Sequence, residues 1–411
     1  MKTAVTLNLV LTLGSLLALA GIQAADVPRS VLTAYRAELT AFRREFGGSR
    51  ELPDVRFFLF GMGQRDKFLY RDGRLTDARS GKLLREWKVK SDIIVPPDYL
   101  VSLETTDGAT VRIREDEAAV WIEEDTTRAV LDGTRHQVKL PDFAGHRYAR
   151  ILRVLHQELL VNITPDGPVP NFFVYGKPWY RDGAMMALAF RETGNLDVIR
   201  DWVLGLKEVF DQNNAGEKEA DNPGQALFLI SLVADKSHPL VPKILEAVRL
   251  FETNGPAGKF IKGRSDFAAH PAYQTKWLKF GLRSLGLPDP YVVPAVEDNY
   301  SALFWMDYRD TYVKGNDADD RGPYPYLGWA VDHFHGLKRS QIGNRDYPLT
   351  WEQRASQANY AGLKSLDPIY VTQKLAAPHT WQAAEVFLYV LKLSQAAAPP
   401  DAGSVPKQPQ Q

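Results

Sequence analysis

The sequence predicts a mainly helical fold preceded by a small antiparallel β module. Between residues 147 and 393, apolar residues recur at helical spacing in about ten segments. Between residues 55 and 140, short apolar or alternating runs are separated by Asp-Gly turn signals, which is typical of β-hairpins. The chain has 411 residues and no cysteine, so the stability of these elements must come from a packed core and not from disulfides.

The first 24 residues have the pattern of a secretory signal peptide. Met1 and Lys2 give a positive start, residues 7–20 are apolar, and Ile22-Gln23-Ala24 offers a cleavage site. A transmembrane helix needs about 20 apolar residues, and this run is shorter. We therefore expect a secreted or periplasmic protein that has no membrane attachment after cleavage.

Residues 25–145 are expected to hold one helix and the β module. The helix is predicted from Val31 to Phe46, with Ser30 as its N-cap and Gly47-Gly48 at its end. The clearest strand signals are Tyr99 to Leu103, Thr110 to Ile113 and Ala119 to Ile122. The turn signals are Asp72-Gly73, Asp107-Gly108 and Asp132-Gly133.

Residues 146–395 are expected to form a helical domain, and no strands are predicted beyond Phe143. The helices are predicted near residues 147–161, 183–193, 195–210, 223–234, 239–252, 270–286, 298–309, 326–337, 350–364 and 380–393. Residues 396–411 are rich in Ala, Pro and Gln, a composition typical of a disordered tail.

Charge and aromatic content narrow the choice of partner. Lysine plus arginine equals aspartate plus glutamate at 50 each, which argues against a nucleic-acid partner. Nine tryptophans and seventeen tyrosines supply flat amphipathic rings of the kind that sugar-binding clefts use. A carbohydrate partner is therefore expected.

Several predicted helices begin in the same way, with aromatic, acidic or histidine residues just before the apolar stretch. These segments are residues 177–183, 217–225, 297–300, 324–326, 349–353 and 378–381. If these helix starts lie together, their rings and carboxylates converge on a bound sugar. Helix capping explains single residues such as Asp182 and Asp298 equally well, but it does not explain the neighbouring tryptophans.

The motif Trp179-Tyr180-Arg181-Asp182 resembles the Trp-x-Arg-Asp signature of glucoamylase-type six-hairpin glycosidases. Two further segments, Leu349-Thr350-Trp351 and Pro378-His379-Thr380-Trp381, are similar to helix starts in that group. The resemblance implies that residues 146–395 form an (α/α) toroid, which about ten helices leave short of the full twelve. It also implies that Arg181 and Asp182 hold sugar hydroxyls in the subsite where cleavage occurs.

Glycoside hydrolysis requires a protonated carboxyl group and an ionised one, about 5 to 9.5 Å apart. The candidates are Glu219, Asp221 and Glu352. Glu352 follows Trp351, whose ring would raise the pKa of this carboxyl group and suit it to be the acid, with Asp221 or Glu219 as the base. The expected substrate-binding residues are Trp179, Tyr180, Arg181, Asp182, Gln225, Asp298, Trp351, His379 and Trp381.

The leading hypothesis is a glycoside hydrolase without a metal or another cofactor. His333 and His335 are two residues apart and would point to different faces of a helix, which argues against a metal site. One alternative is a polysaccharide lyase that uses Tyr180, Arg181 and His379. Another is a glycan-binding protein that has the aromatic cleft but no working acid and base.

Overall fold

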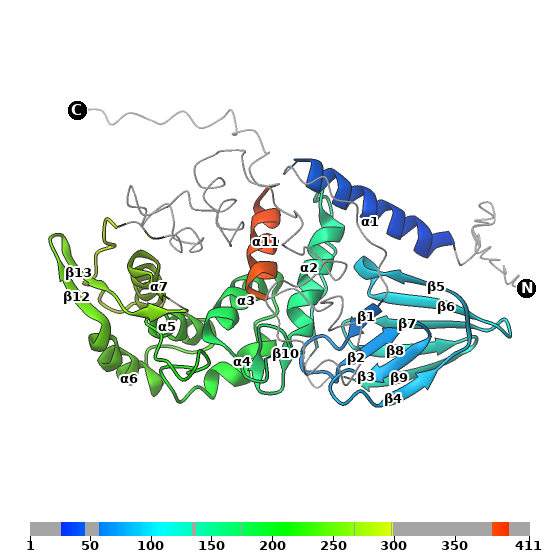
Figure 1. Ribbon diagram of the computed structural model, residues 1–411, viewed down its shortest axis with the longest axis horizontal. Helices are drawn as coiled ribbons and strands as arrows, with labels where there is room; N and C mark the ends of the chain where they lie inside the picture. The colour runs from blue at the N-terminus through cyan, green and yellow to red at the C-terminus, as the bar shows by residue number, and fades with distance from the viewer. Residues whose placement is uncertain are drawn as a thin grey trace, which may run out of the picture.

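The computed structural model describes residues 26–45, 57–133, 137–173, 175–266, 268–296, 298 and 380–393. Figure 1 shows two halves, with the longer sheets at one end and most helices at the other. Helix α1 (Asp26–Glu45) lies along the sheet half, and α2 (Ala149–Val161) stands between the two halves.

The sheet half contains two antiparallel sheets with consecutive strand order. The first sheet comprises β1 (Phe57–Phe60), β2 (Phe68–Arg71), β3 (Arg74–Asp77) and β4 (Leu83–Glu86). The second comprises β5 (Val89–Val95), β6 (Leu100–Thr105), β7 (Thr110–Glu115), β8 (Ala119–Glu124) and β9 (Thr127–Gly133), with the short 3-10 helix η1 (Pro96–Asp98) between β5 and β6. The three clearest strand predictions fall in β6, β7 and β8 and are confirmed.

Two of the three predicted turns are correct. Asp72 and Gly73 have φ of 47° and 77° between β2 and β3, the left-handed conformation that a tight hairpin requires. Gly108, between β6 and β7, has a φ of 91°. Asp132 and Gly133 form no turn, because they pair with Val120 and Ala119 as part of β9.

The first helix begins earlier than predicted. Ser30 lies inside α1, where its hydroxyl donates to the carbonyl of Val27, so it is not the N-cap. The apolar face is as predicted, since Tyr35, Leu39 and Phe42 are fully buried. This face packs α1 against α2 and β5.

The helical half is built from α2 and six further helices. These are α3 (Tyr180–Thr193), α4 (Asp197–Leu204), α5 (Asn222–Val233), α6 (Leu240–Ala247), α7 (Pro271–Ser284) and α11 (Thr380–Leu393). Neighbouring contacts give the order α2, α11, α3, α5, α7, so the last described helix inserts between α2 and α3. The predicted helices at residues 298–309, 326–337 and 350–364 lie outside the described residues.

The prediction that strands stop after Phe143 is wrong. Three short hairpins occur in the helical half, formed by β10 (Ile163–Thr164) with β11 (Gly167–Pro168), β12 (Glu252–Gly255) with β13 (Gly258–Ile261), and β14 (Arg264–Ser265) with β15 (Ala268–Ala269). Strands of two to four residues are too short to show a period of two. In place of the helix predicted at 239–252, the structure has α6 followed by the 3-10 helix η2 (Val248–Phe251). The helix predicted at 195–210 corresponds to the shorter α4.

The expected mainly-α toroid is also wrong. The structure is 40% helical and 25% strand, with eight helices and several antiparallel sheets among the described residues, which is a mixed α and β composition. The β module is not a minor addition, because one continuous apolar core includes its strands and the helices. Gln157 of α2 donates to the carbonyl of Leu59 in β1, and Gly63 donates to the carbonyl of Leu160. Helical periodicity predicted most of the described helices but not how much of the core the sheets supply.

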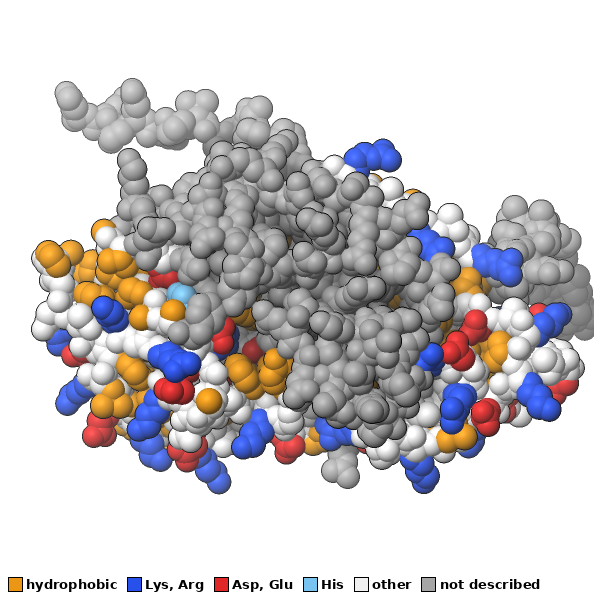
Figure 2. All heavy atoms as spheres, viewed as in Figure 1, with side chains coloured by type: hydrophobic (Ala, Val, Ile, Leu, Met, Phe, Trp, Pro, Cys, Tyr) orange, Lys and Arg blue, Asp and Glu red, His pale blue; other side chains and the backbone are white. Residues whose placement is uncertain are grey.

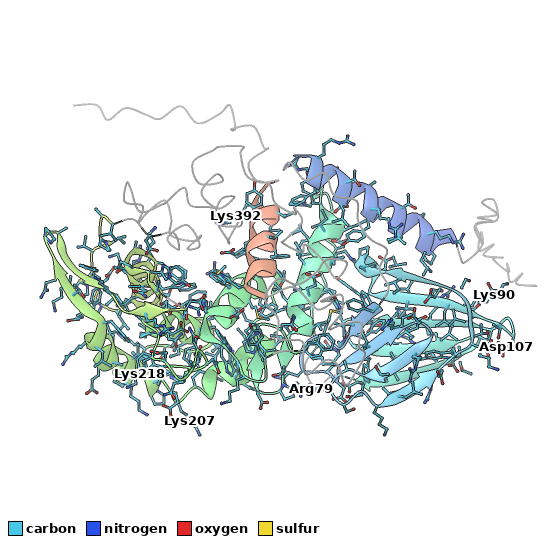
Figure 3. All side chains as sticks on the ribbon, in the orientation of Figure 1. Arg79, Lys90, Asp107, Lys207, Lys218 and Lys392 are labelled. Atoms are coloured by element: carbon cyan, nitrogen blue, oxygen red, sulfur yellow. The ribbon has the colours of Figure 1, made fainter. Side chains whose placement is uncertain are left out.

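Charged side chains lie mainly at the periphery. On the face seen in Figure 2, basic and acidic residues are interspersed over the described part of the chain. Lys90 and Asp107 lie at the far end of the sheet half, and Lys207 and Lys218 at the outer edge of the helical half (Figure 3). None of the described helices combines the length and apolar character needed to cross a membrane.

Candidate active site

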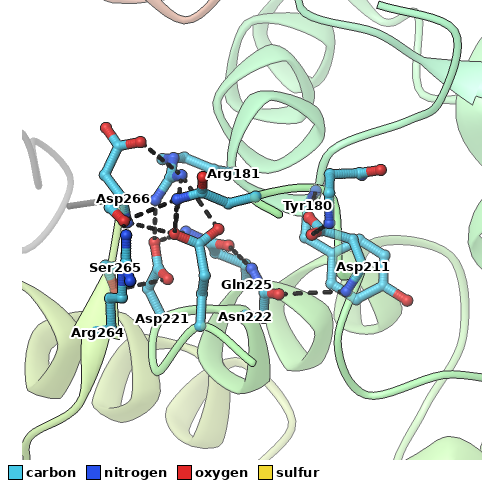
Figure 4. Close-up of polar contacts among 12 residues, drawn as sticks. Tyr180, Arg181, Asp211, Asp221, Asn222, Gln225, Arg264, Ser265 and Asp266 are labelled. Atoms are coloured by element: carbon cyan, nitrogen blue, oxygen red, sulfur yellow. Dashed lines mark hydrogen bonds and ion pairs between the residues drawn. The ribbon is translucent and has the colours of Figure 1, made fainter. Parts of the chain in front are cut away.

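Arg181 is the centre of a buried polar cluster at the start of α3. Its guanidinium donates from Nη1 to Asp221 Oδ2 at 2.9 Å and from Nη2 to both oxygens of Glu219 at 3.3 Å. Nη2 also lies 3.8 Å from Oδ1 of Asp266. Burial alone would lower the pKa of Arg181, but Asp221 and Glu219 hold this pKa above its ordinary value. Arg181 is therefore a fixed cation shared by three carboxyl groups (Figure 4).

Asp221 is held by donors on both of its oxygens. Oδ2 accepts from Arg181 and also from Gln225 Nε2 at 2.9 Å, while Oδ1 accepts from Ser265 Oγ at 2.7 Å. Its side chain is fully buried. Charge-assisted hydrogen bonds of this kind fix both partners in position. The geometry favours a positioning role for Asp221, which holds Arg181 in place.

Glu219 is the carboxyl group among the three partners of Arg181 whose pKa is raised. Burial raises the pKa of Glu219 to about 6, the charge of Arg181 opposes this shift, and the charge of Asp221 adds to it. Oε1 accepts from the backbone N–H of Asp266, and both oxygens meet Arg181. A carboxyl group with a pKa near the working pH is suited to give and take a proton.

Asp266 lies in the turn between β14 and β15. Its φ of +59° is left-handed, a conformation that costs a non-glycine residue about 1 kcal/mol or more and that is enriched at functional sites. Its side chain is 32% exposed, whereas that of Glu219 is 1% exposed. Both carboxylates approach the same Nη2 atom, at 3.3 Å and 3.8 Å, so these oxygens are at most about 7 Å apart.

Aromatic rings surround this cluster. The ring centroids of Trp179 and Trp381 lie 5.9 Å and 5.8 Å from Cζ of Arg181. Tyr175 contacts Trp179 edge-on, with ring centroids 5.5 Å apart. Burial and the negative charges of Asp182 and Asp266 raise the pKa of Tyr175. Flat apolar rings beside hydrogen-bond acceptors are the features that bind a sugar.

The starts of four helices meet at this cluster. Asp182 of α3 accepts from Thr380 of α11 at 3.0 Å, and Arg181 of α3 contacts Asp221, the N-cap of α5. Gln274 of α7 donates to Ser265 Oγ at 2.9 Å. The positive ends of helix dipoles stabilise nearby carboxylates, so this arrangement supports a cluster rich in acidic residues.

Close packing of α5 on α7 fixes the position of Asp221. A Cβ added at Gly224 would lie 2.4 Å from the backbone nitrogen of Leu278, so only glycine allows this approach. The contact brings the start of α5 beside Tyr273 of α7. Burial and the charge of Asp221 raise the pKa of Tyr273 far above its usual value.

Most of the predicted site residues that can be described lie in or next to the cluster, and three do not contribute as expected. Trp381 lies beside Arg181 but is only 6% exposed and packs in the core. Tyr180 donates its hydroxyl to the carbonyl of Glu208 at 2.6 Å, on the side of the helix away from Asp221 (Figure 4). Asp298 accepts from the backbone N–H of Tyr273 at 2.9 Å and so caps α7. Gln225 supports Asp221, as described above. Trp351, Glu352 and His379 lie outside the described residues.

Four residues of the cluster were not predicted, namely Tyr175, Ser265, Asp266 and Tyr273. Ser265 and Asp266 belong to a hairpin of two-residue strands, which has no periodic signal. The nearby Gly263 and the Arg-Ser-Asp sequence indicate only a turn. No property of the sequence between residues 221 and 265 predicts that Ser265 donates to Asp221.

Among the described residues, no group of three or more His, Cys, Asp or Glu side chains is arranged to hold a metal ion. No protein-family model, curated protein or solved structure matches this chain.

Proposed function

We propose that this protein is a glycoside hydrolase-like enzyme in which Glu219 is the general acid and Asp266 supplies the second carboxylate. The observation that carries the proposal is the contact of both carboxylates with one nitrogen of Arg181, combined with their different environments. Glu219 is buried and has a pKa of about 6, whereas Asp266 is partly exposed. Hydrolysis of a glycosidic bond requires two carboxyl groups in different environments, one of which is able to donate a proton.

Glu219 and Asp266 have different roles in the proposed reaction. Protonated Glu219 gives its proton to the leaving glycosidic oxygen as the bond to the anomeric carbon breaks. Asp266, which solvent reaches, acts as the base for an attacking water molecule or as the nucleophile toward the anomeric carbon. Arg181 remains charged throughout and keeps both carboxyl groups in place. The rings of Trp179 and Tyr175, which are partly exposed, are the apolar surfaces against which the sugar packs.

The contacts favour hydrolysis over a lyase reaction. A lyase would need a tyrosine or histidine base, for which Tyr180 and His379 are the candidates, and an arginine free to neutralise a uronate carboxylate; His379 lies outside the described residues. The hydroxyl of Tyr180 is directed to the carbonyl of Glu208, and Arg181 is already shared by Glu219 and Asp221. Neither residue is therefore placed for the role that a lyase would give it.

The proposal includes export of the chain, because residues 1–24 have the pattern of a signal peptide. In that setting the substrate is an oligosaccharide or polysaccharide outside the cytoplasm. Export is tested by sequencing the N-terminus of the protein recovered from the producing cell. A start near Ala25 supports the proposal, and an intact Met1 contradicts it.

Enzyme activity is tested with glycans and nitrophenyl glycosides, by measuring released reducing ends or nitrophenol. We expect turnover by the natural chain and a loss of about 10²- to 10⁴-fold in kcat for Glu219→Gln and Asp266→Asn. Glu217→Gln is the matched control, since Glu217 is two residues away and pairs only at the surface with Arg264, at 3.2 Å. Full activity of Glu219→Gln would remove Glu219 from its role, and glycan binding without product would indicate a binding protein.

A further inference from the structure

The loop between α4 and α5 reaches both proposed carboxyl residues through Asn214. Nδ2 of Asn214 donates to the backbone carbonyl of Asp266 at 2.7 Å and to Oε1 of Glu219 at 3.4 Å. Both of these neighbours are acceptors, so the nitrogen of the amide, and not its oxygen, faces them. The two hydrogens of one amide group therefore link the proposed acid to the residue that supplies the second carboxylate.

The backbone of this loop holds Asn214 in place. Gln212 and Ala215, on either side of it, have left-handed φ values of 55° and 54°, a conformation that non-glycine residues keep only where surrounding contacts impose it. At the front of the loop, Asp211 accepts from the backbone N–H of Tyr180 at 2.7 Å, which ties the loop to the start of α3. Asn214 is therefore carried by a segment with a fixed conformation beside the site.

The two oxygens of Glu219 have different partners. Oε1 accepts from the backbone N–H of Asp266, from Asn214 and from Arg181, whereas Oε2 has only Arg181 as a donor within the described part of the chain. A protonated carboxyl group has one carbonyl oxygen, which accepts, and one hydroxyl, which must donate. Three donors directed at Oε1 leave no acceptor there for a hydroxyl. The acid proton is therefore favoured on Oε2.

We propose that Asn214 is a positioning residue, which keeps Oε1 of Glu219 as the accepting oxygen, so that Oε2 carries the proton for the leaving group, and which holds the Asp266 turn in place. This inference rests on the proposed function, because it concerns the acid and the second carboxylate of the same site. The carbonyl of Asp266 also accepts from Nε of Arg264 at 2.9 Å, so the turn keeps this hydrogen bond when Asn214 is replaced. Loss of Asn214 should therefore affect the acid more than the fold.

The test compares two variants of the full chain. Asn214→Ala removes the amide donor, and Asn214→Asp replaces it with an acceptor that bears a negative charge. We expect kcat to fall about 10- to 100-fold in Asn214→Ala, with KM within about threefold, because Asn214 steadies the acid without touching the sugar. The fall should be larger in Asn214→Asp, because the new carboxylate accepts a proton placed on Oε1 and draws it away from Oε2. Unchanged kcat in Asn214→Ala, or a smaller loss in Asn214→Asp than in Asn214→Ala, would overturn the inference.

Gln212→Glu is the matched control, because it adds the same charge to an exposed side chain of the same loop and should leave kcat within about twofold. The alkaline limb of kcat reports loss of the acid proton, and it should move up by about one pH unit in Asn214→Asp and not in Gln212→Glu. A variant that is merely destabilised would lose activity without moving this limb. The described charged neighbours of Glu219 are the same in all three variants, namely Arg181, Asp211, Asp221 and Asp266.

A titration keeps the two proposals distinguishable. Carboxyl-carbon NMR of protein isotopically labelled at glutamate follows the protonation of Glu219, whose signal is the one missing from Glu219→Gln. We expect the pKa of Glu219 to be higher in Asn214→Ala and Asn214→Asp than in the natural chain, because the lost N–H donor favours the charged form. If no glycoside is hydrolysed, the hydrolase proposal fails and this titration still tests Asn214. The same pKa in all three proteins would overturn the inference whether or not glycosides are hydrolysed.

Discussion

Two buried charge clusters in this protein are built from the same residue types and differ in what their carboxylates contact. In the sheet half, Glu115 accepts from the backbone nitrogens of Gly61 and Met62 at 2.8 Å and 2.6 Å and from Arg65 at 2.7 Å. In the helical half, Glu219 accepts mainly from Arg181, which it shares with Asp221 and Asp266. Glu115 has two backbone donors besides Arg65, whereas Glu219 has one, the N–H of Asp266, and shares Arg181 with two other carboxyl groups.

The basic residues of the two clusters also differ in their contacts, because those of the sheet cluster donate to backbone carbonyls. Arg65 also donates to the carbonyls of Asp116 and Glu117, at 2.8 Å and 2.6 Å, and Lys67 donates to the carbonyls of Gly61 and Gly63. Burial lowers the pKa of Lys67 to about 7. This cluster ties the β1–β2 loop to the end of β7 by backbone contacts. We infer that the sheet cluster stabilises the fold, and that the helical cluster retains a proton-exchanging group.

The largest expected effect is on catalysis at Glu219. Glu219→Gln keeps the shape of the side chain but cannot donate the acid proton, so kcat is expected to fall by about 10²- to 10⁴-fold. The midpoint of denaturant unfolding at pH 7 should not decrease, since burial disfavours the charged form of Glu219 and Asp221 still pairs with Arg181 in the variant. Steady-state kinetics and urea unfolding of one preparation check both parts. A large loss of stability with unchanged kcat would show that Glu219 stabilises the fold and does not act as the acid.

The next largest effect is on stability at Glu115. Glu115→Gln leaves Arg65 buried without its carboxylate and places an amide against two backbone donors, so the free energy of unfolding is expected to fall by about 3 to 5 kcal/mol. Glu104→Gln is the control, because Glu104 pairs with Lys90 at the surface and is expected to change stability by less than about 1 kcal/mol. Denaturant unfolding of both variants decides the matter. Equal changes in the free energy of unfolding would show that the sheet cluster does not stabilise the fold.

A smaller effect is the pH dependence of stability that Glu219 contributes. Its pKa is about 6 in the folded protein against 4.5 for the ordinary group, so the folded state binds the proton more tightly. Its contribution to stability is therefore full below pH 4.5 and is lost as pH rises through 6, by about 2 kcal/mol. Glu219→Gln should lack this loss, and unfolding at pH 4.5 and 7 measures the difference. An identical pH dependence in both proteins would contradict the raised pKa.

The smallest effect is expected at Ser265. Ser265→Ala removes the hydroxyl that donates to Asp221 Oδ1, which is expected to cost about 1.5 kcal/mol of stability. A shifted Asp221 would also move Arg181, so the pH profile of kcat should shift as well. Ser265→Thr retains a hydroxyl donor and should restore the profile. If Ser265→Ala changes stability alone, Ser265 has no positioning role.

The local elements and part of the site could be predicted from the sequence. Helical periodicity gave α2, α3, α5, α7 and α11, because a buried helix face repeats every 3.6 residues. The Asp-Gly pairs identified two hairpins because they favour left-handed backbone at tight turns. The recurrence of rings and acids at helix starts indicated Arg181, Glu219 and Asp221, which the structure brings together.

Only the tertiary structure decided the fold class and showed that Asp266 is the second carboxylate beside Glu219. The mixed composition arises because the sheets and helices share one core, and no local pattern reports which surfaces will pack together. Asp266 joins the site because β14 and β15 fold into a short hairpin that brings its backbone N–H to Glu219. The sequence by itself determined which residues form helices and hairpins, since these depend on neighbours along the chain. Burial and charge at Glu219 depend on residues distant in sequence, so only the assembled structure gives this carboxyl group its raised pKa.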